Sequence, residues 1–215
     1  MGTCDLRVEQ ARTLAAPRLA YGALSRALFA ALDLVYGRRS TLAKFRVLEL
    51  VARVPYQAWE SVGYVAITHT SGRPGFARRI VDFVEEARAH QDNEQWHLLI
   101  LEELVPNRFG WWRRVPIPQL LALVYYHVSW LLYVLRPAWS YRLNAEFEDH
   151  AEHTYMEYVA AHPELERRAF MSAFEREYGR FASMADLLRC IALDEREHKD
   201  QSLARLAAPR FGLAA

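Results

Sequence analysis

Two short motifs in the sequence place a glutamate and a histidine three residues apart. The first is Glu94-x-x-His97 and the second is Glu195-x-x-His198, and each lies in a segment whose apolar residues have helical spacing. Side chains at positions i and i+3 project from one face of a helix, so each motif presents a carboxylate and an imidazole to one point. Two such helices, with a glutamate from each of two further helices, form the metal site of di-iron carboxylate bundles.

A single glutamate is present in each of two further apolar segments. Glu49 follows Leu48 in one segment, and Glu148 follows Phe147 in the other. Hard carboxylate oxygens balance the charge of two iron ions and bridge them, and imidazole nitrogens complete the set. A zinc site more often uses Cys or several His. The candidate metal ligands are therefore Glu49, Glu94, His97, Glu148, Glu195 and His198.

Long helical patterns separated by Gly and Pro predict an all-α fold in which four helices supply these ligands. One Glu-x-x-His motif alone is usually a solvated helix face, but two motifs interleaved with two single glutamates favour a ferritin-like four-helix di-iron bundle. We expect one domain over residues 17–207, an extended or disordered segment over 1–16 and a C-terminal tail over 208–215. The expected helices cover residues 17–36, from 41 past a bend caused by Pro55, 76–104, 117–135, 137–161 and 184–207.

Two of these helices have the composition of membrane-facing elements. Residues 117–135 carry no formal charge and follow two tryptophans and two arginines at positions 111–114. A helix lying in the membrane interface, a buried core helix and a membrane span all fit this pattern, and we favour the interfacial helix. Residues 17–36 combine a wide apolar face with basic flanks, which also favours an interfacial helix over a purely buried one.

Several residues near the candidate ligands have types that suit supporting roles. Asn93 and Asp194 each directly precede a ligand glutamate, where they would accept the free ring N–H of a ligand histidine. The alternative is that both are surface residues of charged helices. Tyr155 lies seven residues after Glu148, two turns along the same face, where a phenol would supply an electron and a proton. A tyrosine that only packs in the core remains the alternative.

The overall composition excludes several classes of protein. The chain has 215 residues, of which 52% are hydrophobic, and a net charge of +1. This length supports one domain with a full core, and the balanced charge gives no reason to expect binding to nucleic acid. Cys4 and Cys190 are too few and too far apart for a disulfide framework, so we expect two free thiols.

Four segments together resemble the alternative oxidase family, and especially its plastid terminal oxidase branch. They are LELVARVPY at residues 48–56, NEQWHLLILEEL at 93–104, HAEHTY at 150–155 and DEREH at 194–198. The resemblance covers roughly residues 17–205, and the four motifs are specific when they occur together. It implies a membrane-bound non-haem enzyme that oxidises ubiquinol or plastoquinol, reduces dioxygen to water and pumps no protons.

The resemblance also implies roles for individual residues. The six candidate ligands would hold two iron ions, Tyr155 would be the redox tyrosine, and Thr154 matches a functionally important position. Quinol would bind near Lys44 and Leu48, between the membrane helices and the bundle. The family further implies a monotopic homodimer on one leaflet, here of a bacterial inner membrane or a thylakoid-type membrane.

Two departures from the family pattern bear on the substrate. The family usually has arginine where this chain has Lys44, and lysine keeps the charge but lacks the planar fork of donors. The segment before the last helix is also shorter than in the plastid enzymes. A di-iron oxygenase or desaturase acting on a membrane lipid is an alternative enzyme, and a ferritin-like iron-binding protein is an alternative of another class.

Overall fold

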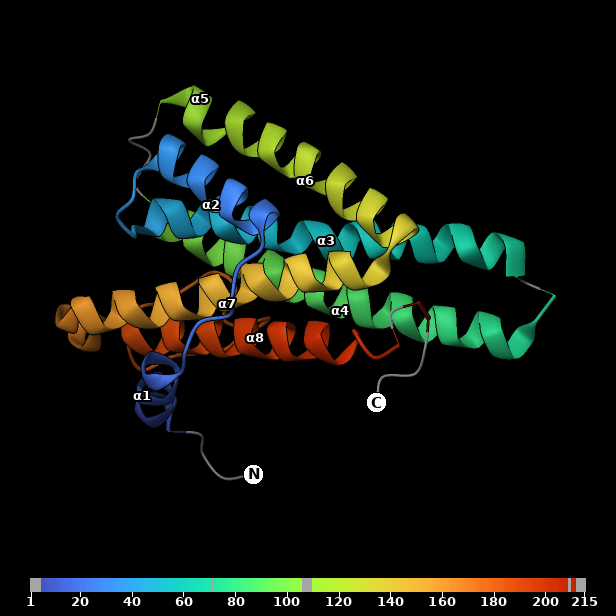
Figure 1. Ribbon diagram of the computed structural model, residues 1–215. Coiled ribbons are helices and arrows are strands. Elements are labelled where there is room, and N and C mark those ends of the chain that lie inside the picture. Colours follow the sequence, from blue (N-terminus) through green and yellow to red (C-terminus); the bar gives the residue numbers. More distant parts are fainter. Residues whose placement is uncertain (1–4, 71, 106–109, 209, 212–215) are drawn as a thin grey trace.

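The computed structural model describes residues 5–70, 72–105, 110–208 and 210–211, and these residues contain helices and turns without any strand. The helical residues follow the order expected for an all-α chain (Figure 1). The elements are α1 Leu6–Ala15, α2 Ala23–Tyr36, α3 Leu42–Thr70, α4 Pro74–Leu104, α5 Trp111–Arg114, α6 Pro116–Leu135, α7 Pro137–Ala161, the short 3₁₀ helix η1 Pro163–Arg167 and α8 Met184–Ala204.

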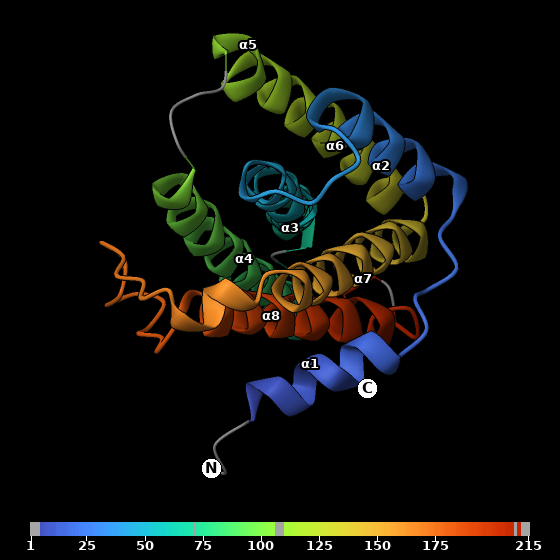
Figure 2. The same cartoon turned by 90° about the vertical axis from the view of Figure 1, so that its left-hand side faces the viewer.

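Helices α3, α4, α7 and α8 form the bundle that contains the core. Seen end-on in Figure 2, α3 lies between α4 and α7, and α8 closes the bundle below them. Helices α2, α5 and α6 cover the side beyond α3, whereas α1 lies on the opposite side, against α7 and α8. The predicted all-α bundle with additional helices on one side is therefore confirmed.

The local sequence explains where these helices begin. Pro137 opens α7 at its first turn, where the missing N–H of proline has no cost. Ser183 caps α8, and its side chain accepts a hydrogen bond of 3.1 Å from the backbone N–H of Asp186. Helix α3 continues past Pro55 to Thr70, so the proline lies inside one long helix, as predicted.

The N-terminal part of the chain differs from our prediction. We expected an extended or disordered segment up to residue 16, but residues 6–15 form α1. Polar contacts rather than an apolar stripe hold this helix. Asp5 caps it, the amide of Gln10 donates to Met156 O at 2.9 Å, and Thr13 donates to Glu152 at 2.7 Å. The periodic spacing of apolar residues predicts a helix only when one face of that helix is apolar and buried. A helix held by polar contacts therefore gives no such signal in the sequence.

The helix predicted over residues 17–36 is also shorter than expected, because α2 begins at Ala23. The backbone before it turns away from the helical path at Gly22, whose N–H donates to Glu146 Oε2 at 2.7 Å. Asp149 accepts from Leu19 N at 3.0 Å and from the Tyr21 hydroxyl at 2.9 Å. Carboxylates of α7 therefore hold this stretch in an extended form.

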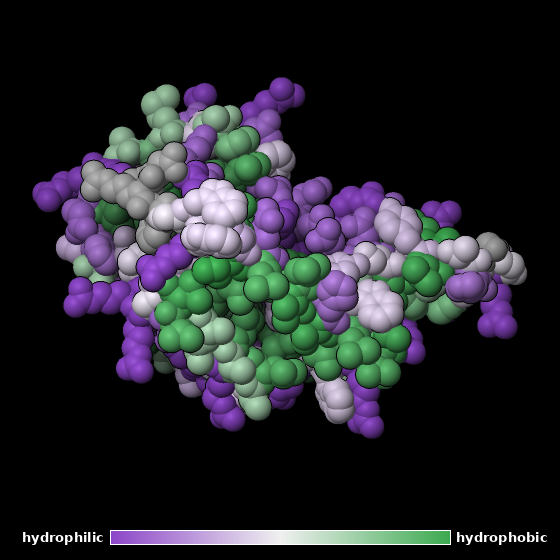
Figure 3. All heavy atoms as spheres, turned by 90° about the horizontal axis from the view of Figure 1, so that it is seen from above, coloured by the Kyte–Doolittle hydropathy of each residue, from purple (hydrophilic) through white to green (hydrophobic). Residues whose placement is uncertain are grey.

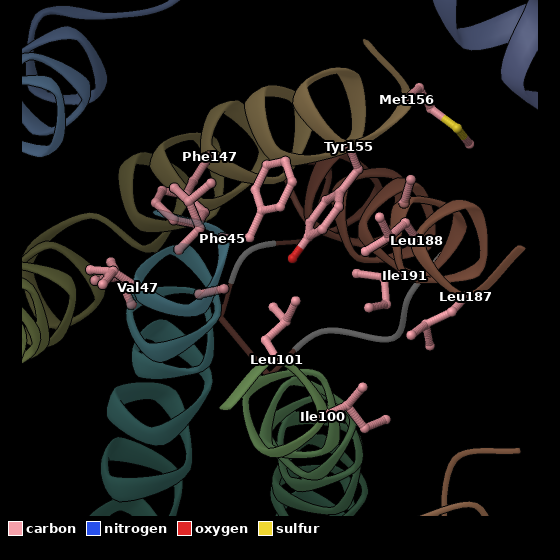
Figure 4. Packing of buried hydrophobic residues seen from close by; sticks show 14 of the residues in the cluster. Phe45, Val47, Ile100, Leu101, Phe147, Tyr155, Met156, Leu187, Leu188 and Ile191 are labelled. Carbon is pink, nitrogen blue, oxygen red and sulfur yellow. The ribbon is translucent and has the colours of Figure 1, made fainter. Parts of the chain in front are cut away.

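Buried apolar side chains of the four bundle helices point toward one another at the end of the bundle near Tyr155. Figure 4 shows Phe45 of α3, Leu101 of α4, Tyr155 of α7 and Ile191 of α8 directed into a common interior. All four are at most 1% exposed. This packing fixes the axial and rotational positions of the helices, and therefore the positions of the polar side chains further along the same faces.

Candidate metal centre

The six predicted ligands come together in the interior of the bundle. Their helices are α3 for Glu49, α4 for Glu94 and His97, α7 for Glu148, and α8 for Glu195 and His198. Each is at most 4% exposed. Because residues three apart share a helix face, each Glu-x-x-His motif directs both of its side chains to the centre.

The ligand atoms form two overlapping sets. One set contains Glu49, Glu94, His97 and Glu195, and within it the ligand atoms lie within 4.8 Å of one another. The other set contains Glu94, Glu195, Glu148 and His198, at the same spacing. Glu94 and Glu195 belong to both sets, so each of two neighbouring cations would find these two carboxylates within reach.

The histidine nitrogens that face the cluster are both Nδ1 atoms. His97 Nδ1 lies 3.2 Å from Glu49 Oε2 and 3.2 Å from Glu195 Oε1. His198 Nδ1 lies 2.7 Å from Glu94 Oε1, yet neither of these two atoms makes a hydrogen bond within the described part of the chain. These nitrogen and oxygen atoms gather around one shared space in the bundle.

Buried polar atoms without partners show that this donor set fits cations. Within the described residues, both carboxylate oxygens of Glu94, both of Glu195, Oε2 of Glu148 and Nδ1 of His198 are buried and lack a hydrogen bond. Leaving one such group unsatisfied in a protein interior costs about 1–3 kcal/mol, and more for a charged group. A pair of divalent cations would satisfy these atoms together, and oxygen-rich sets with imidazole suit iron or manganese.

The protonation behaviour of the cluster has the same cause. Burial raises the pKa of Glu49 and of Glu148 well above the ordinary range, and the neighbouring carboxylate of Glu195 raises both further. Burial opposes the charged form of His198, but Glu195 and Glu94 outweigh it and raise the pKa of this histidine to about 10. Protons thus neutralise the excess negative charge in the chain alone, and metal cations would take over that role.

The predicted support for His97 is present in the structure. His97 Nε2 lies 3.0 Å from Asp194 Oδ2, so this carboxylate fixes the ring and leaves Nδ1 for the cluster. The Tyr178 hydroxyl also donates to Asp194, at 2.6 Å. The prediction for Asn93 was wrong in its partner, because its amide donates to Asp194 Oδ2 at 3.4 Å instead of accepting from a histidine.

Tyr155 lies where its spacing from Glu148 predicted, at the edge of the cluster. Its hydroxyl donates to Glu49 Oε1, on the helix opposite its own, and its ring stacks on Phe45 at 4.2 Å between centroids. Figure 4 shows the hydroxyl directed into the interior of the bundle. Burial, with the nearby Glu49 carboxylate, raises the pKa of Tyr155 well above its usual value, so the phenol is a proton donor.

Two contacts of the cluster were missed from the sequence. The Tyr56 hydroxyl donates to Glu148 Oε1 at 3.1 Å, and Tyr178 reaches Asp194 from the irregular segment before α8. Tyr56 lies seven residues after Glu49, and Tyr155 lies at the same offset from Glu148. The sequence could therefore have predicted that Tyr56 lies near the cluster. Tyr178 had no such signal, because an irregular segment has no periodicity.

His198 also lines a narrow cavity between α3, α4, α7 and α8. Tyr56 and His90 form neighbouring parts of its wall, with the His90 ring 4.6 Å from the His198 ring. The ion pair between Arg205 and Glu86 crosses the outer part of this cavity. Burial, and then repulsion from His198, lower the pKa of His90 to about 4, so His90 is a neutral imidazole.

The residues predicted near a quinol lie between α2, α3 and α7. Lys44 Nζ is buried and forms an ion pair with Asp33 Oδ1 of α2, and it also donates to Gly37 O at 3.1 Å. Leu48 is fully buried in the core, one residue before Glu49. Thr154 directs its hydroxyl to His150 O of its own helix at 2.6 Å, so a substrate role for it stays a prediction.

A third group of acidic residues and histidine has a different character. Asp149, Glu152 and His153 lie together on α7, but Lys199 Nζ is 3.5 Å from Asp149 Oδ1. Arg196 Nε is 2.9 Å from Glu152 Oε1. Basic side chains already balance these carboxylates, so this group ties α8 to α7.

A helical bundle with paired Glu-x-x-His motifs and two further glutamates defines the class of di-iron carboxylate proteins. Within this class, the family model described as "Alternative oxidase" matches residues 9–205. The chain belongs to the alternative oxidase family.

The similar curated proteins are plant ubiquinol oxidases. The chain is 39% identical to "Ubiquinol oxidase 4, chloroplastic/chromoplastic" of Arabidopsis thaliana over 130 residues, which cover 60% of this chain and 34% of that protein. It is 28% identical to "Ubiquinol oxidase 2, mitochondrial" of Glycine max over 175 residues, covering 78% and 49%. The chain thus spans between a third and a half of the length of these relatives, and the first of them supports a position near the plastid branch.

Proposed function

We propose that the protein is a quinol oxidase that couples the oxidation of a quinol to the four-electron reduction of dioxygen to water, without pumping protons. The observation that carries the proposal is the buried pair of overlapping ligand sets in a member of this family. Two iron ions held by the six side chains would accept electrons from quinol and pass them to dioxygen. The names of the relatives, all ubiquinol oxidases, support the substrate class.

The residues of the chain have separate tasks in this proposal. The bundle excludes water from the cluster, because apolar side chains surround the six ligands. Asp194 holds the ring of His97, and Tyr155 holds a proton within reach of Glu49 Oε1. Quinol would bind between α2, α6 and the bundle, near Lys44 and Leu48. The ion pair between Lys44 and Asp33 holds the Lys44 ammonium group in this region.

An oxygen electrode with a defined substrate tests the proposed reaction. Iron-loaded protein in lipid vesicles is expected to consume one dioxygen for every two quinols oxidised to quinone, with no oxygenated lipid formed. Supplying ubiquinol and plastoquinol in parallel would identify the preferred head group. Oxygen uptake that needs no quinol and yields a hydroxylated or desaturated lipid would instead establish the alternative enzyme, and absence of uptake would leave iron binding as the function.

The surface over α2 and α6 supports attachment to a membrane. Figure 3 shows apolar residues gathered on this face. Residues 111–135 are long and apolar enough to cross a membrane, but only a small part of their most apolar stretch is buried in the protein. This exposure disfavours the buried core helix. The large exposed apolar residues of α2, α5 and α6 are Leu24, Leu34, Trp111, Trp112, Leu120, Leu123, Val124, Trp130, Leu131, Val134 and Leu135.

We propose that α2, α5 and α6 lie in one leaflet, because the same apolar face is continuous along helices packed sideways on the bundle. The membrane would be a bacterial inner membrane or a thylakoid-type membrane. We also propose that the protein is a homodimer, as the resemblance to the family implies.

Charged substitutions on this face are expected to release the protein from lipid. In the double variant Leu123→Glu and Leu131→Glu, partitioning into vesicles should fall more than about tenfold, since burying one leucine contributes about 1.5–3 kcal/mol. Flotation with vesicles measures the partitioning. The matched control is Val8→Glu with Leu14→Glu, two exposed apolar residues of α1 on the opposite side. Equal flotation of the two double variants would contradict the proposed attachment, and protease access to the ends of α6 from opposite sides would establish a span.

A further inference from the structure

Two of the candidate ligands are glutamates without a ligand histidine on the same helix, and each is followed, seven residues later, by a buried tyrosine. Tyr56 follows Glu49 on α3, and Tyr155 follows Glu148 on α7. Seven residues make about two helical turns, or roughly 10.5 Å of axial rise, so neither phenol is directed to the glutamate of its own helix. Each reaches across instead, Tyr155 to Glu49 and Tyr56 to Glu148. Reciprocal contacts of this kind require that α3 and α7 run antiparallel, as Figure 1 shows.

Because of these contacts, the two carboxylate oxygens of Glu148, and likewise those of Glu49, have different partners. In Glu148, Oε1 accepts from the Tyr56 hydroxyl at 3.1 Å, while Oε2 is buried without a hydrogen bond in the described residues. In Glu49, Oε1 accepts from Tyr155 and Oε2 faces His97 Nδ1 at 3.2 Å. By contrast, both oxygens of Glu94 and of Glu195 are free of hydrogen bonds. In the described residues, the carboxylates shared by both ligand sets thus have two oxygens without a hydrogen bond, Glu148 has one, and the second oxygen of Glu49 bonds to His97, which is itself a candidate ligand.

A neighbouring amide fixes the direction in which Tyr56 donates. Asn144 Nδ2 donates to the Tyr56 oxygen at 2.9 Å, and the same amide nitrogen donates to Ser202 Oγ at 3.1 Å. A phenol has one proton, and an N–H pointing at its oxygen turns that proton away from the amide. The proton of Tyr56 is therefore directed to Glu148 Oε1.

We propose that Tyr56 is a positioning residue of the metal centre, which holds Oε1 of Glu148 so that this glutamate offers only Oε2 to the cation held with His198. It is the counterpart of Tyr155, which does the same for Glu49 on the His97 side. The two tyrosines differ in their surroundings, since Tyr56 borders the cavity with His90 whereas Tyr155 is enclosed by the core. This inference rests on the proposed binding of two metal ions.

Titration of the metal-free full-length protein with Co²⁺, followed by its absorption bands, tests the inference without use of turnover. Wild type is expected to bind two ions with two dissociation constants. In Tyr56→Phe one of these should rise about 10–100-fold, the usual effect of removing a group that orients a ligand, and the other should stay within about threefold. The matched control is Tyr141→Phe, which removes another buried hydroxyl beside the same cavity, bonded to Tyr133 at 3.3 Å.

A second variant separates positioning from packing. Asn144→Leu removes the amide that directs the phenol, and it should weaken the same site by a smaller factor, about three- to tenfold. Because Asn144 acts through Tyr56, the double variant should bind Co²⁺ no more weakly than Tyr56→Phe alone. Additive losses, or two unchanged dissociation constants in Tyr56→Phe, would overturn the inference while leaving the proposed function intact. A wild type that binds fewer than two ions would overturn both.

Discussion

The Glu195→Ala variant is expected to retain at most one metal ion and to lose quinol oxidase activity. Glu195 belongs to both ligand sets, and both of its oxygens are buried without a hydrogen bond in the described residues. Its loss therefore removes a ligand from each proposed cation at once. Metal analysis after removal of loosely bound ions, together with oxygen uptake, measures the two effects. Glu197→Ala is the matched control, because Glu197 lies on the same helix with its side chain exposed.

Thermal unfolding distinguishes this loss from simple misfolding. Each metal ion bound only by the folded state stabilises wild type by about 4 kcal/mol at a thousandfold excess over Kd, and the stabilisation from two ions should be absent or halved in the variant. In the metal-free state the carboxylate of Glu195 repels those of Glu49 and Glu148, but it also pairs with His97 and His198, whose pKa it raises. The isosteric Glu195→Gln keeps the volume of the side chain, so the same loss of metal-dependent stabilisation in this variant would show that the carboxylate, and not the packing, is required. A fully active Glu195→Ala protein, or one zinc ion per chain, would refute the proposed centre.

The Tyr155→Phe variant is expected to fold and to bind two irons at saturating iron, yet to lose turnover at least about tenfold. Phenylalanine keeps the ring that stacks on Phe45, and a substitution of this kind usually costs less than about 1.5 kcal/mol. What it removes is the proton held at Glu49 Oε1. A positioned proton donor typically contributes 10²–10⁴-fold to a rate, which sets the scale of the loss.

Tyr158→Phe is the matched control for this variant. Its ring also packs on Phe45, at 5.1 Å, but it lies outside the contacts of the cluster. Iron content and quinone binding are measured alongside oxygen uptake, and iron is kept in excess so that weaker binding at Glu49 does not limit the rate. Near-normal turnover in Tyr155→Phe would reduce this tyrosine to a packing residue.

The positions of the candidate metal ligands could be predicted because they follow from helix periodicity. The offset of three residues between Glu94 and His97, and again between Glu195 and His198, places each pair on one face whatever the rest of the chain does. The long apolar patterns likewise predicted the bundle helices, with ends within a few residues of those observed. Periodicity also predicted that Tyr155 would lie close to the cluster, although it did not indicate Glu49 as the partner.

Contacts between distant segments were decided by the tertiary structure alone. Helix α1 is held by Thr13 and Gln10 against α7, and an isolated ten-residue helix without an apolar stripe gives no reason to expect stability. The pairing of Lys44 with Asp33 likewise depends on how α2 packs beside α3. Such contacts join residues whose separation in sequence carries no periodic relation.

The sequence by itself determined which side chains share a helix face, and hence the six candidate ligands and the class of centre that they suit. Only the tertiary structure decided that Glu94 and Glu195 belong to both sets, and that each single glutamate meets the tyrosine of the facing helix. The physical reason is that the rotation of a side chain about its own helix is set locally, at 3.6 residues per turn. The axial alignment of one helix against another is set by packing across the core, where α3 and α7 run antiparallel and bring residue 49 beside 155 and residue 56 beside 148.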